Sequence, residues 1–336
     1  MRDEGEASMP VRVTSDSLAT ITASTVCPVH TRRIEHMFDT PDLVSSRERA
    51  AVLALAARRA APWNRLAGMI EEAGSALAVL DELDSATPDQ LFPVDDETLT
   101  LDELEEHIHA WDREGFHVVT VLDESYPVNL RMVHDRPAML FVQGALDERD
   151  SRSVAVVGTR QASPVGLDAA REIARQLVAE GYVVVSGLAA GIDSAAHTGA
   201  LDAGGRTIAV IGTGLRESFP KANAELQQRI AREAAVLSQF WPGQGPRKWT
   251  FPARNAVMSG FARTTVVVEA AGRSGARMQA RLALEHGRPV FLLDSLMEHD
   301  WARVYREYDG VYVVHDGHEI LGHLERLYSD ELVLHG

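Results

Sequence analysis

The chain has 336 residues, of which 45% are hydrophobic and 24% charged, and its formal net charge is −16. This is a globular composition, with length for one large domain or two ordinary ones. The single cysteine, Cys27, excludes an internal disulfide and a multi-cysteine zinc site, as expected in a reducing compartment. No apolar run approaches the ~20 residues of a membrane-spanning helix, so we expect a cytoplasmic protein without membrane contact.

The negative charge is unevenly distributed. Residues 1–150 carry 13 basic and 29 acidic side chains, whereas residues 151–288 carry 17 basic and 10 acidic ones, and residues 289–336 carry 3 and 10. A basic stretch therefore lies between acidic flanks, and the local field decides what a surface attracts. Only two of the 33 cations are lysines. Arginine suits bidentate phosphate contacts, although a GC-rich coding genome explains its abundance equally well.

In chain order, residues 1–44 lack sustained periodicity and are predicted to be a disordered tail. Residues 45–100 are predicted to form a small helical subdomain, with helices over 50–61, 64–73 and 75–83. The remainder, 101–336, is predicted to be an extended Rossmann-like core. It begins with a helix and two strands, predicted over 101–114, 116–121 and 137–144.

Beyond residue 150, apolar Val/Ile-rich runs alternate with segments of helical periodicity. Strands are predicted at 153–157, 182–186, 207–211, 235–238, 264–268, 289–293 and 311–314, and helices near 165–180, 193–203, 222–233, 255–262, 275–286 and 317–327. This alternation indicates parallel pairing with right-handed crossovers. The predicted fold class is therefore α/β, a Rossmann-like, doubly wound and mainly parallel sheet with a small N-terminal helical subdomain.

The carboxyl ends of parallel strands form one edge of a sheet, and glycine-bearing loops follow several strands here. In the first loop, Gly158 turns the chain off its strand, Ser163 caps a helix that Pro164 opens, and Arg160 places a cation beside exposed amides. The loop lacks the glycine spacing of a dinucleotide fingerprint or a P-loop. A tight turn with Arg160 in a surface ion pair is the alternative.

The second loop contains Gly187 and Gly191, whose lack of side chains permits close approach of a ligand or a neighbouring loop. Asp193 and His197 follow at a spacing that places them on one helical face. No serine or cysteine nucleophile is placed to use them, so a structural pair is favoured over a catalytic one. In the third loop, after Ile211, Lys221 is a candidate for the same edge.

The segment Phe251–Gly260 is polar and carries arginine where a core segment would be apolar, and Arg247-Lys248-Trp249 precedes it. Cations, a ring and amides together are typical of surfaces that hold phosphates and stack bases. After the next strand, Arg273 and Arg277 are further candidates. No set of histidines with metal-ligand spacing is evident among His107, His109, His315, His318 and His323, so no metal site and no cofactor are expected.

Taken together, these loops resemble the DprA/Smf family over about residues 115–290, most specifically at Val154–Gly166, Ser186–His197, Gly212–Asn223 and Phe251–Gly260. The resemblance implies a Rossmann-like core that binds single-stranded DNA and loads a RecA-type recombinase, without catalysis, in natural transformation or recombination. It also implies a homodimer. The chain resembles a divergent member, since Ala256 replaces a repeated arginine, and we expect no C-terminal winged-helix domain.

By motif, the resemblance implies that Phe251 stacks a base and that the amides of Gly158 and Gly187 hold phosphates. The full predicted nucleic-acid-binding set comprises Gly158, Thr159, Arg160, Ser163, Gly166, Ser186, Gly187, Gly191, Lys248, Phe251, Arg254, Asn255, Arg273 and Ser274. The leading alternative is a nucleotide sensor of the related LOG type, or a phosphoribohydrolase. The latter is disfavoured because the chain lacks a Pro-Gly-Gly-x-Gly-Thr loop.

Overall fold

The computed structural model describes residues 44–61, 63–86, 99–272 and 274–332, all within one unit that spans residues 36–336. The predicted disordered tail, 1–44, therefore falls almost wholly outside the described residues. The segment 87–98 also lies outside the described residues. Within the described part of the chain, no helix is long and apolar enough to cross a membrane.

Helices precede the sheet, as predicted. They are α1 (Ser46–Ala57), α2 (Trp63–Ala73), α3 (Ala76–Ala86) and α4 (Leu101–Arg113). Ser45 begins α1 by accepting a hydrogen bond from the amide of Glu48, and Thr100 and Glu103 form a capping box at α4. Arg47 of α1 pairs with Glu105 of α4 at 2.8 Å. Helix α4, which belongs to the predicted Rossmann-like core, thus contacts a helix of the predicted helical subdomain. The domain boundary between residues 100 and 101 stays a prediction.

The described residues form one nine-stranded sheet in the order β1-β2-β6-β5-β4-β3-β7-β8-β9. The strands are β1 (Phe116–Thr120), β2 (Met139–Gly144), β3 (Ser153–Val157), β4 (Val183–Ser186), β5 (Thr207–Val210), β6 (Ala235–Ser238), β7 (Thr264–Val267), β8 (Val290–Leu293) and β9 (Val311–Val314). Seven strands, β3 to β9, pair in parallel, while β1 and β2 are antiparallel. The mainly parallel, doubly wound sheet is confirmed.

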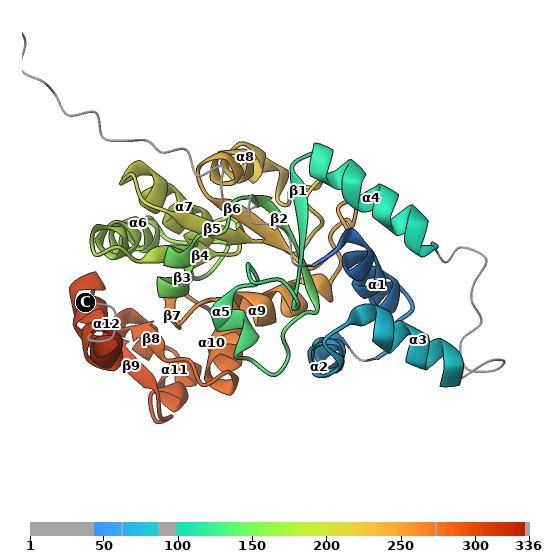
Figure 1. Cartoon of the computed structure of the whole chain (residues 1–336). Helices are drawn as coiled ribbons and strands as arrows, with labels where there is room; N and C mark the ends of the chain where they lie inside the picture. The colour runs from blue at the N-terminus through green and yellow to red at the C-terminus, as the bar shows by residue number, and fades with distance from the viewer. Residues whose placement is uncertain (1–43, 62, 87–98, 273, 333–336) are drawn as a thin grey trace, which may run out of the picture. The chain divides into compact units, whose positions relative to one another are not determined.

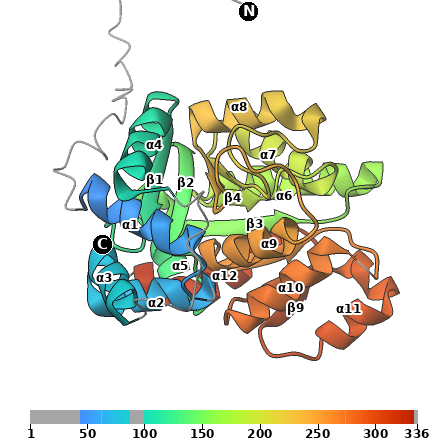
Figure 2. The same ribbon diagram turned by 90° about the vertical axis from the view of Figure 1, so that its right-hand side faces the viewer.

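Alternate residues of the central strands face two separate apolar cores. In β3, Val154 and Val156 pack beneath α6 (Pro164–Ala179), α7 (Ile192–Asp202) and α12 (Gly317–Leu332), while Ala155 and Val157 face the other core. That second core includes α9 (Thr250–Phe261) and α10 (Gly275–Glu285). Figures 1 and 2 show α6 and α7 on one side of the sheet and α9 and α10 on the other. Burial on both faces explains the continuous Val/Ile runs.

Helix α9 begins at Thr250, five residues before its predicted start. Pro252 in the predicted loop lies in the first turn of the helix, where its missing amide hydrogen breaks no helical hydrogen bond. The segment that includes Phe251 and Arg254 is therefore helical. Short elements absent from the prediction are α5 (Val128–Arg131), α11 (Asp300–Tyr305) and 3-10 helices at Glu148–Arg152, Lys221–Asn223 and Asp294–Glu298. The helix α8 (Ala224–Glu233) was predicted closely.

Candidate nucleic-acid interface

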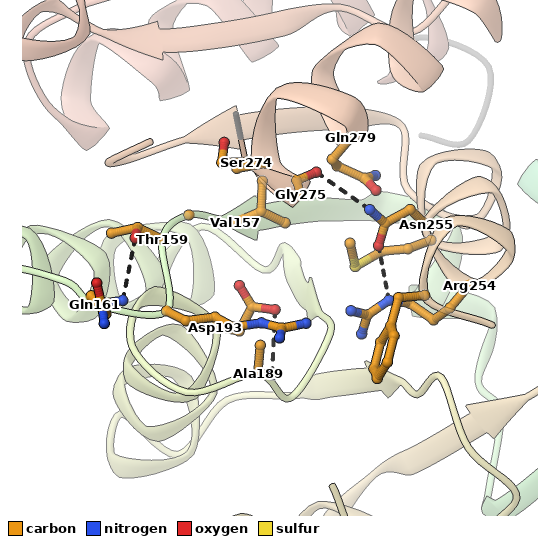
Figure 3. Close-up of a pocket in the computed structure, with 15 residues that line it drawn as sticks. Val157, Thr159, Gln161, Ala189, Asp193, Arg254, Asn255, Ser274, Gly275 and Gln279 are labelled. Atoms are coloured by element: carbon orange, nitrogen blue, oxygen red, sulfur yellow. Dashed lines mark hydrogen bonds between the residues drawn. The ribbon is translucent and has the colours of Figure 1, made fainter. Parts of the chain in front are cut away.

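A pocket of about 520 Å³ opens at the carboxyl ends of β3 and β7 (Figure 3). The chain leaves β3 toward α6 on one face and β7 toward α10 on the other, so this is the switch point of the doubly wound sheet, where such folds bind ligands. Seven of the predicted residues line it: Gly158, Thr159, Arg160, Phe251, Arg254, Asn255 and Ser274. Ala189 and Asp193 also line the pocket, so four segments distant in sequence meet here.

Arg160 and Phe251 form the exposed wall of this pocket. The guanidinium of Arg160 lies 5.3 Å from the centre of the Phe251 ring, a cation–π contact. The ring of Phe251 also lies 5.5 Å from the ring of Phe219. Among the described residues, Arg160 has no hydrogen-bond or ion-pair partner, contrary to the surface ion pair considered as the alternative. A smaller pocket of about 120 Å³, bordered by Gly187, Phe219 and Phe251, adjoins the first.

Arg254 is only 5% exposed and bonds mainly to the protein. Its Nη1 donates to the carbonyls of Gly187 and Val210, at the ends of β4 and β5, the latter at 2.8 Å, and its Nε donates to Asn255 Oδ1 at 2.9 Å (Figure 3). The guanidinium approaches Gly187 so closely that a methyl group there would collide with it. Arg254 therefore fixes the floor of the pocket, which the predicted role as a surface phosphate ligand did not include.

Asp193 lies beside Arg254 as its buried counter-charge. Burial raises the pKa of Asp193, while the charge of Arg254 and hydrogen bonds from the amides of Ala189, Gly158 and Gly187 act to lower it. Burial likewise lowers the pKa of the Arg254 guanidinium, and Asp193 opposes that effect. The two buried groups are thus coupled electrostatically beneath the pocket, and the exposed side chains at its rim are the charges that a ligand meets directly.

Asn255 connects the same floor to helix α10. Its Nδ2 donates to the carbonyl of Gly275 at 3.3 Å, as drawn in Figure 3. Ser274 begins α10 by accepting from the amide of Arg277 at 3.2 Å, so it acts as a helix cap at the pocket edge. Arg273 lies outside the described residues, and its predicted role stays a prediction.

The N-terminus of α6 already holds a carboxylate from the protein itself. Glu269, which follows β7, accepts hydrogen bonds from the amide and hydroxyl of Ser163 at 3.0 and 2.9 Å, and its carbonyl accepts from the amide of Thr159 at 2.6 Å. Ser163 also caps α6, as predicted. A methyl group on Gly166 would collide with the Glu269 carboxylate, so this glycine makes room for it. The position that holds a nucleotide phosphate in many Rossmann-like folds is therefore occupied.

The remaining predicted residues lie around this edge or beneath it. Lys248 is exposed in the loop between β6 and α9, outside the pocket. Gly191 begins α7 and lies against the loop of Thr159, whose carbonyl accepts from the amide of Ile192 at 3.3 Å. Ser186 is fully buried and donates to the carbonyl of Val156 at 2.7 Å, so it supports the sheet and does not face the pocket.

His197 is fully buried on α7, where its Nδ1 lies 2.7 Å from the Thr207 hydroxyl. Asp193 is buried too and accepts hydrogen bonds from the amides of Gly187 and Ala189. The two side chains therefore have structural roles, as predicted, and are not placed as a catalytic pair. Burial lowers the pKa of His197 to about 3.

This pKa predicts an acid-sensitive stability. Unfolded His197 takes up a proton near pH 6.5, whereas the folded residue does not until about pH 3, so its contribution is complete above pH 6.5 and is lost as pH falls through this window. We expect the free energy of unfolding to fall by about 1.4 kcal/mol per pH unit below pH 6 from this group. Urea unfolding of the parent and of His197→Gln at pH 7, 6 and 5 measures the difference; equal slopes would contradict it.

Similarity to known proteins extends over more than half of the chain. The model of the family described as DNA recombination-mediator protein A matches residues 117–307, more than half of the chain. The chain belongs to this family, also named DprA/Smf. It is 41% identical over 215 residues to "DNA processing protein DprA" of Streptococcus pneumoniae, covering 62% of this chain and 75% of that protein. It spans 54% of Protein Smf from Synechocystis and 62% of DprA from Bacillus subtilis.

Solved DprA structures share the fold. The crystal structure from Streptococcus pneumoniae superposes with a TM-score of 0.62 at 32% identity, covering 83% of this chain and 98% of that one. The structure of DNA processing protein A from Helicobacter pylori, described for its single-stranded DNA binding mode, superposes with a TM-score of 0.56 at 27% identity over 63% and 96%. The DprA/Smf resemblance found in the loop motifs is therefore confirmed at the level of family and fold.

Proposed function

We propose that this chain binds single-stranded DNA along the carboxyl edge of its parallel sheet and catalyses no covalent reaction. The observation that carries the proposal is the contact of exposed Arg160 with the half-buried ring of Phe251, between two adjoining pockets. A cation fixed over a ring presents both a phosphate contact and a stacking surface. The Helicobacter pylori relative, whose structure concerns single-stranded DNA binding, supports the same ligand class.

Several exposed cations extend this surface along the edge. Lys221 follows β5, and Arg247 and Lys248 follow β6. Like Arg160, they have no ion-pair partner within the described part of the chain, whereas surface arginines elsewhere, such as Arg175, bond to nearby carboxylates. Unpaired cations on consecutive loops suit a polyanion that runs past several strands more than a single mononucleotide.

The occupied N-terminus of α6 argues against the nucleotide sensor and the phosphoribohydrolase. A mononucleotide phosphate at that site would face the carboxylate of Glu269 and would have to displace its hydrogen bonds to Ser163. A strand of DNA avoids this position by contacting the rim. Thermal-shift screening separates the two proposals, because a sensor is stabilised by one mononucleotide and a DNA binder by oligo-dT.

The biological setting extends the same proposal and rests on family membership. In this setting the chain is a cytoplasmic protein that protects incoming single-stranded DNA and loads a RecA-type recombinase in natural transformation or recombination. It acts as a homodimer. Co-sedimentation of a RecA-type recombinase with the DNA complex tests the loading step, separately from DNA binding itself.

Arg160→Ala and Lys248→Ala are expected to weaken oligo-dT binding and to flatten its salt dependence. Each lost phosphate contact reduces the slope of log K against log salt by about 0.7 for single-stranded DNA. Fluorescence anisotropy between 50 and 300 mM salt, roughly the range over which such effects are large, gives both quantities. Arg175→Ala, which removes a paired surface arginine, is the matched control. If Arg160→Ala and Lys248→Ala bind like the parent at every salt concentration, the proposed surface is wrong.

A further inference from the structure

A second cluster of ligand-type side chains lies away from the DNA-binding edge. His134 and Asp135, in the loop between α5 and β2, meet His286, which caps the carboxyl end of α10, and one ligand atom of each lies within 4.8 Å of the others. Helix α10 begins at the pocket with Gly275 and reaches His286 eleven residues later, about 16 Å along its axis. The cluster is therefore distinct from the proposed DNA surface.

The hydrogen bonds around His286 fix the orientation of its ring. Its side chain is 1% exposed, its Nδ1 lies 2.8 Å from the Ser259 hydroxyl, and its Nε2 lies 2.7 Å from Asp135 Oδ1. The Ser259 hydroxyl has one proton, which it can donate to Nδ1 or to the carbonyl of Ala256 at 3.1 Å; when it bonds to Ala256 it accepts a proton from Nδ1, the tautomer in which Nε2 can bind a metal ion. Nε2 lies at hydrogen-bonding distance from the carboxylate oxygen, so without metal the two atoms share a proton, and after a small separation both are placed to bind one ion.

His134 completes a partly open site. Its ring packs edge-to-face against His286 with centroids 5.7 Å apart, and it is exposed to solvent. The carboxylate of Asp135 is the third ligand group, with its side chain 18% exposed. The carboxyl end of α10 adds the negative end of a helix dipole, which also favours a cation.

We propose that His134, Asp135 and His286 bind one divalent transition-metal ion of the zinc type. Two imidazole nitrogens and one carboxylate oxygen are a ligand set that zinc accepts, with a fourth position open to water. Bonds of about 2.0–2.1 Å in a tetrahedron place ligand atoms roughly 3.3 Å apart, so Nε2 and Oδ1 need separate only slightly from their present contact. Ser259 supplies the outer hydrogen bond that metal-bound histidines commonly have.

Such an ion would join three segments of the fold. Asp135 lies next to Arg136, which donates to Glu71 of α2 at 3.1 Å, while Ser259 belongs to α9 and His286 to α10. The ion would thus hold the loop after α5 against the two helices that form the pocket floor. Thermal stabilisation by the metal follows from binding to the folded chain alone.

The test is titration of the metal-free, tag-free full chain with Zn²⁺ by isothermal calorimetry, with melting temperature measured in parallel. One ion per chain and a raised melting temperature are expected. His134→Ala and Asp135→Asn should abolish both effects, and Ser259→Ala should weaken binding by about 10- to 100-fold because it removes the outer hydrogen bond. His134 is exposed, so its removal leaves the core intact, and melting without metal checks the fold of every variant.

Asp294→Asn is the matched control. Asp294 and His315 form a hydrogen-bonded pair at 2.8 Å, but the described residues add no third metal ligand at suitable spacing there. Its zinc binding should equal that of the parent. No zinc binding by the parent would overturn the proposal and leave a proton between His286 and Asp135. Binding that survives both His134→Ala and Asp135→Asn would overturn it as well, because the ion would then lie elsewhere.

Discussion

Arg254→Met is expected to lower the free energy of unfolding by about 3–5 kcal/mol, because each buried carbonyl left without a donor costs about 1–3 kcal/mol and buried Asp193 loses the nearby opposite charge. The substitution leaves Asp193 buried without its counter-charge. It also leaves the carbonyls of Gly187 and Val210 without the donor that now joins the ends of β4 and β5. Both effects act on the same floor of the pocket, so the loss should exceed that of any exposed arginine.

Urea unfolding of four proteins measures this effect: the parent, Arg254→Met, Asp193→Asn and the double variant. Because the double variant removes both charges together, it should be less destabilised than the sum of the single variants. Arg281→Met is the control, since Arg281 is exposed and pairs only with Glu285, four residues on in α10. A loss in Arg254→Met no larger than that in Arg281→Met would contradict the buried role of Arg254.

The fold was predictable because its signals are local and repeated. Strands such as β3 read as continuous apolar runs since both faces are buried, and glycines mark the turns that follow them. The start of α9 was missed because Pro252 was interpreted as part of a loop, although proline fits the first helical turn. One-turn elements such as α5 carry too few residues for a periodic pattern.

The candidate site was predictable in location but not in the role of each residue. From the sequence, both Arg254 and Arg160 are predicted to be cations of a DNA groove, since each lies in a segment that follows the carboxyl end of a strand. Only the fold separates them: Arg254 is turned inward onto the carbonyl of Val210, whereas Arg160 is exposed and lies over the half-buried ring of Phe251. Burial of this kind depends on how α9 packs against β4 and β5, which no short motif encodes.

Contacts between distant segments explain what the sequence did not reveal. No motif singles out Glu269, yet its carboxylate occupies the N-terminus of α6, which lies more than a hundred residues earlier. His286 and Asp135 are separated by 151 positions, so no spacing rule for metal ligands joins them. The glycine at 166 was the one available signal for Glu269, because it makes room for that carboxylate.

Phe251→Ala is expected to weaken oligo-dT binding by about 1–3 kcal/mol, which is roughly a 5- to 150-fold rise in Kd, the usual effect of removing one ring that stacks a base. Phe251 is half-buried and contacts both Arg160 and Phe219, so it offers the pocket a fixed aromatic surface. Phe251→Trp keeps such a surface and should bind close to the parent level. Tyr308→Ala, which removes an exposed ring from a different loop, controls for aromatic content.

Salt dependence distinguishes stacking at Phe251 from the phosphate contact at Arg160. Phe251→Ala removes no charge, so the slope of log K against log salt should stay at the parent value while the affinity falls, and oligo-dC should lose as much as oligo-dT because stacking is sequence-tolerant. Since Arg160 lies 5.3 Å from the Phe251 ring, the double variant should lose less than the two single losses combined. Full additivity, or a flattened slope in Phe251→Ala alone, would show that this ring does not stack a base beside Arg160.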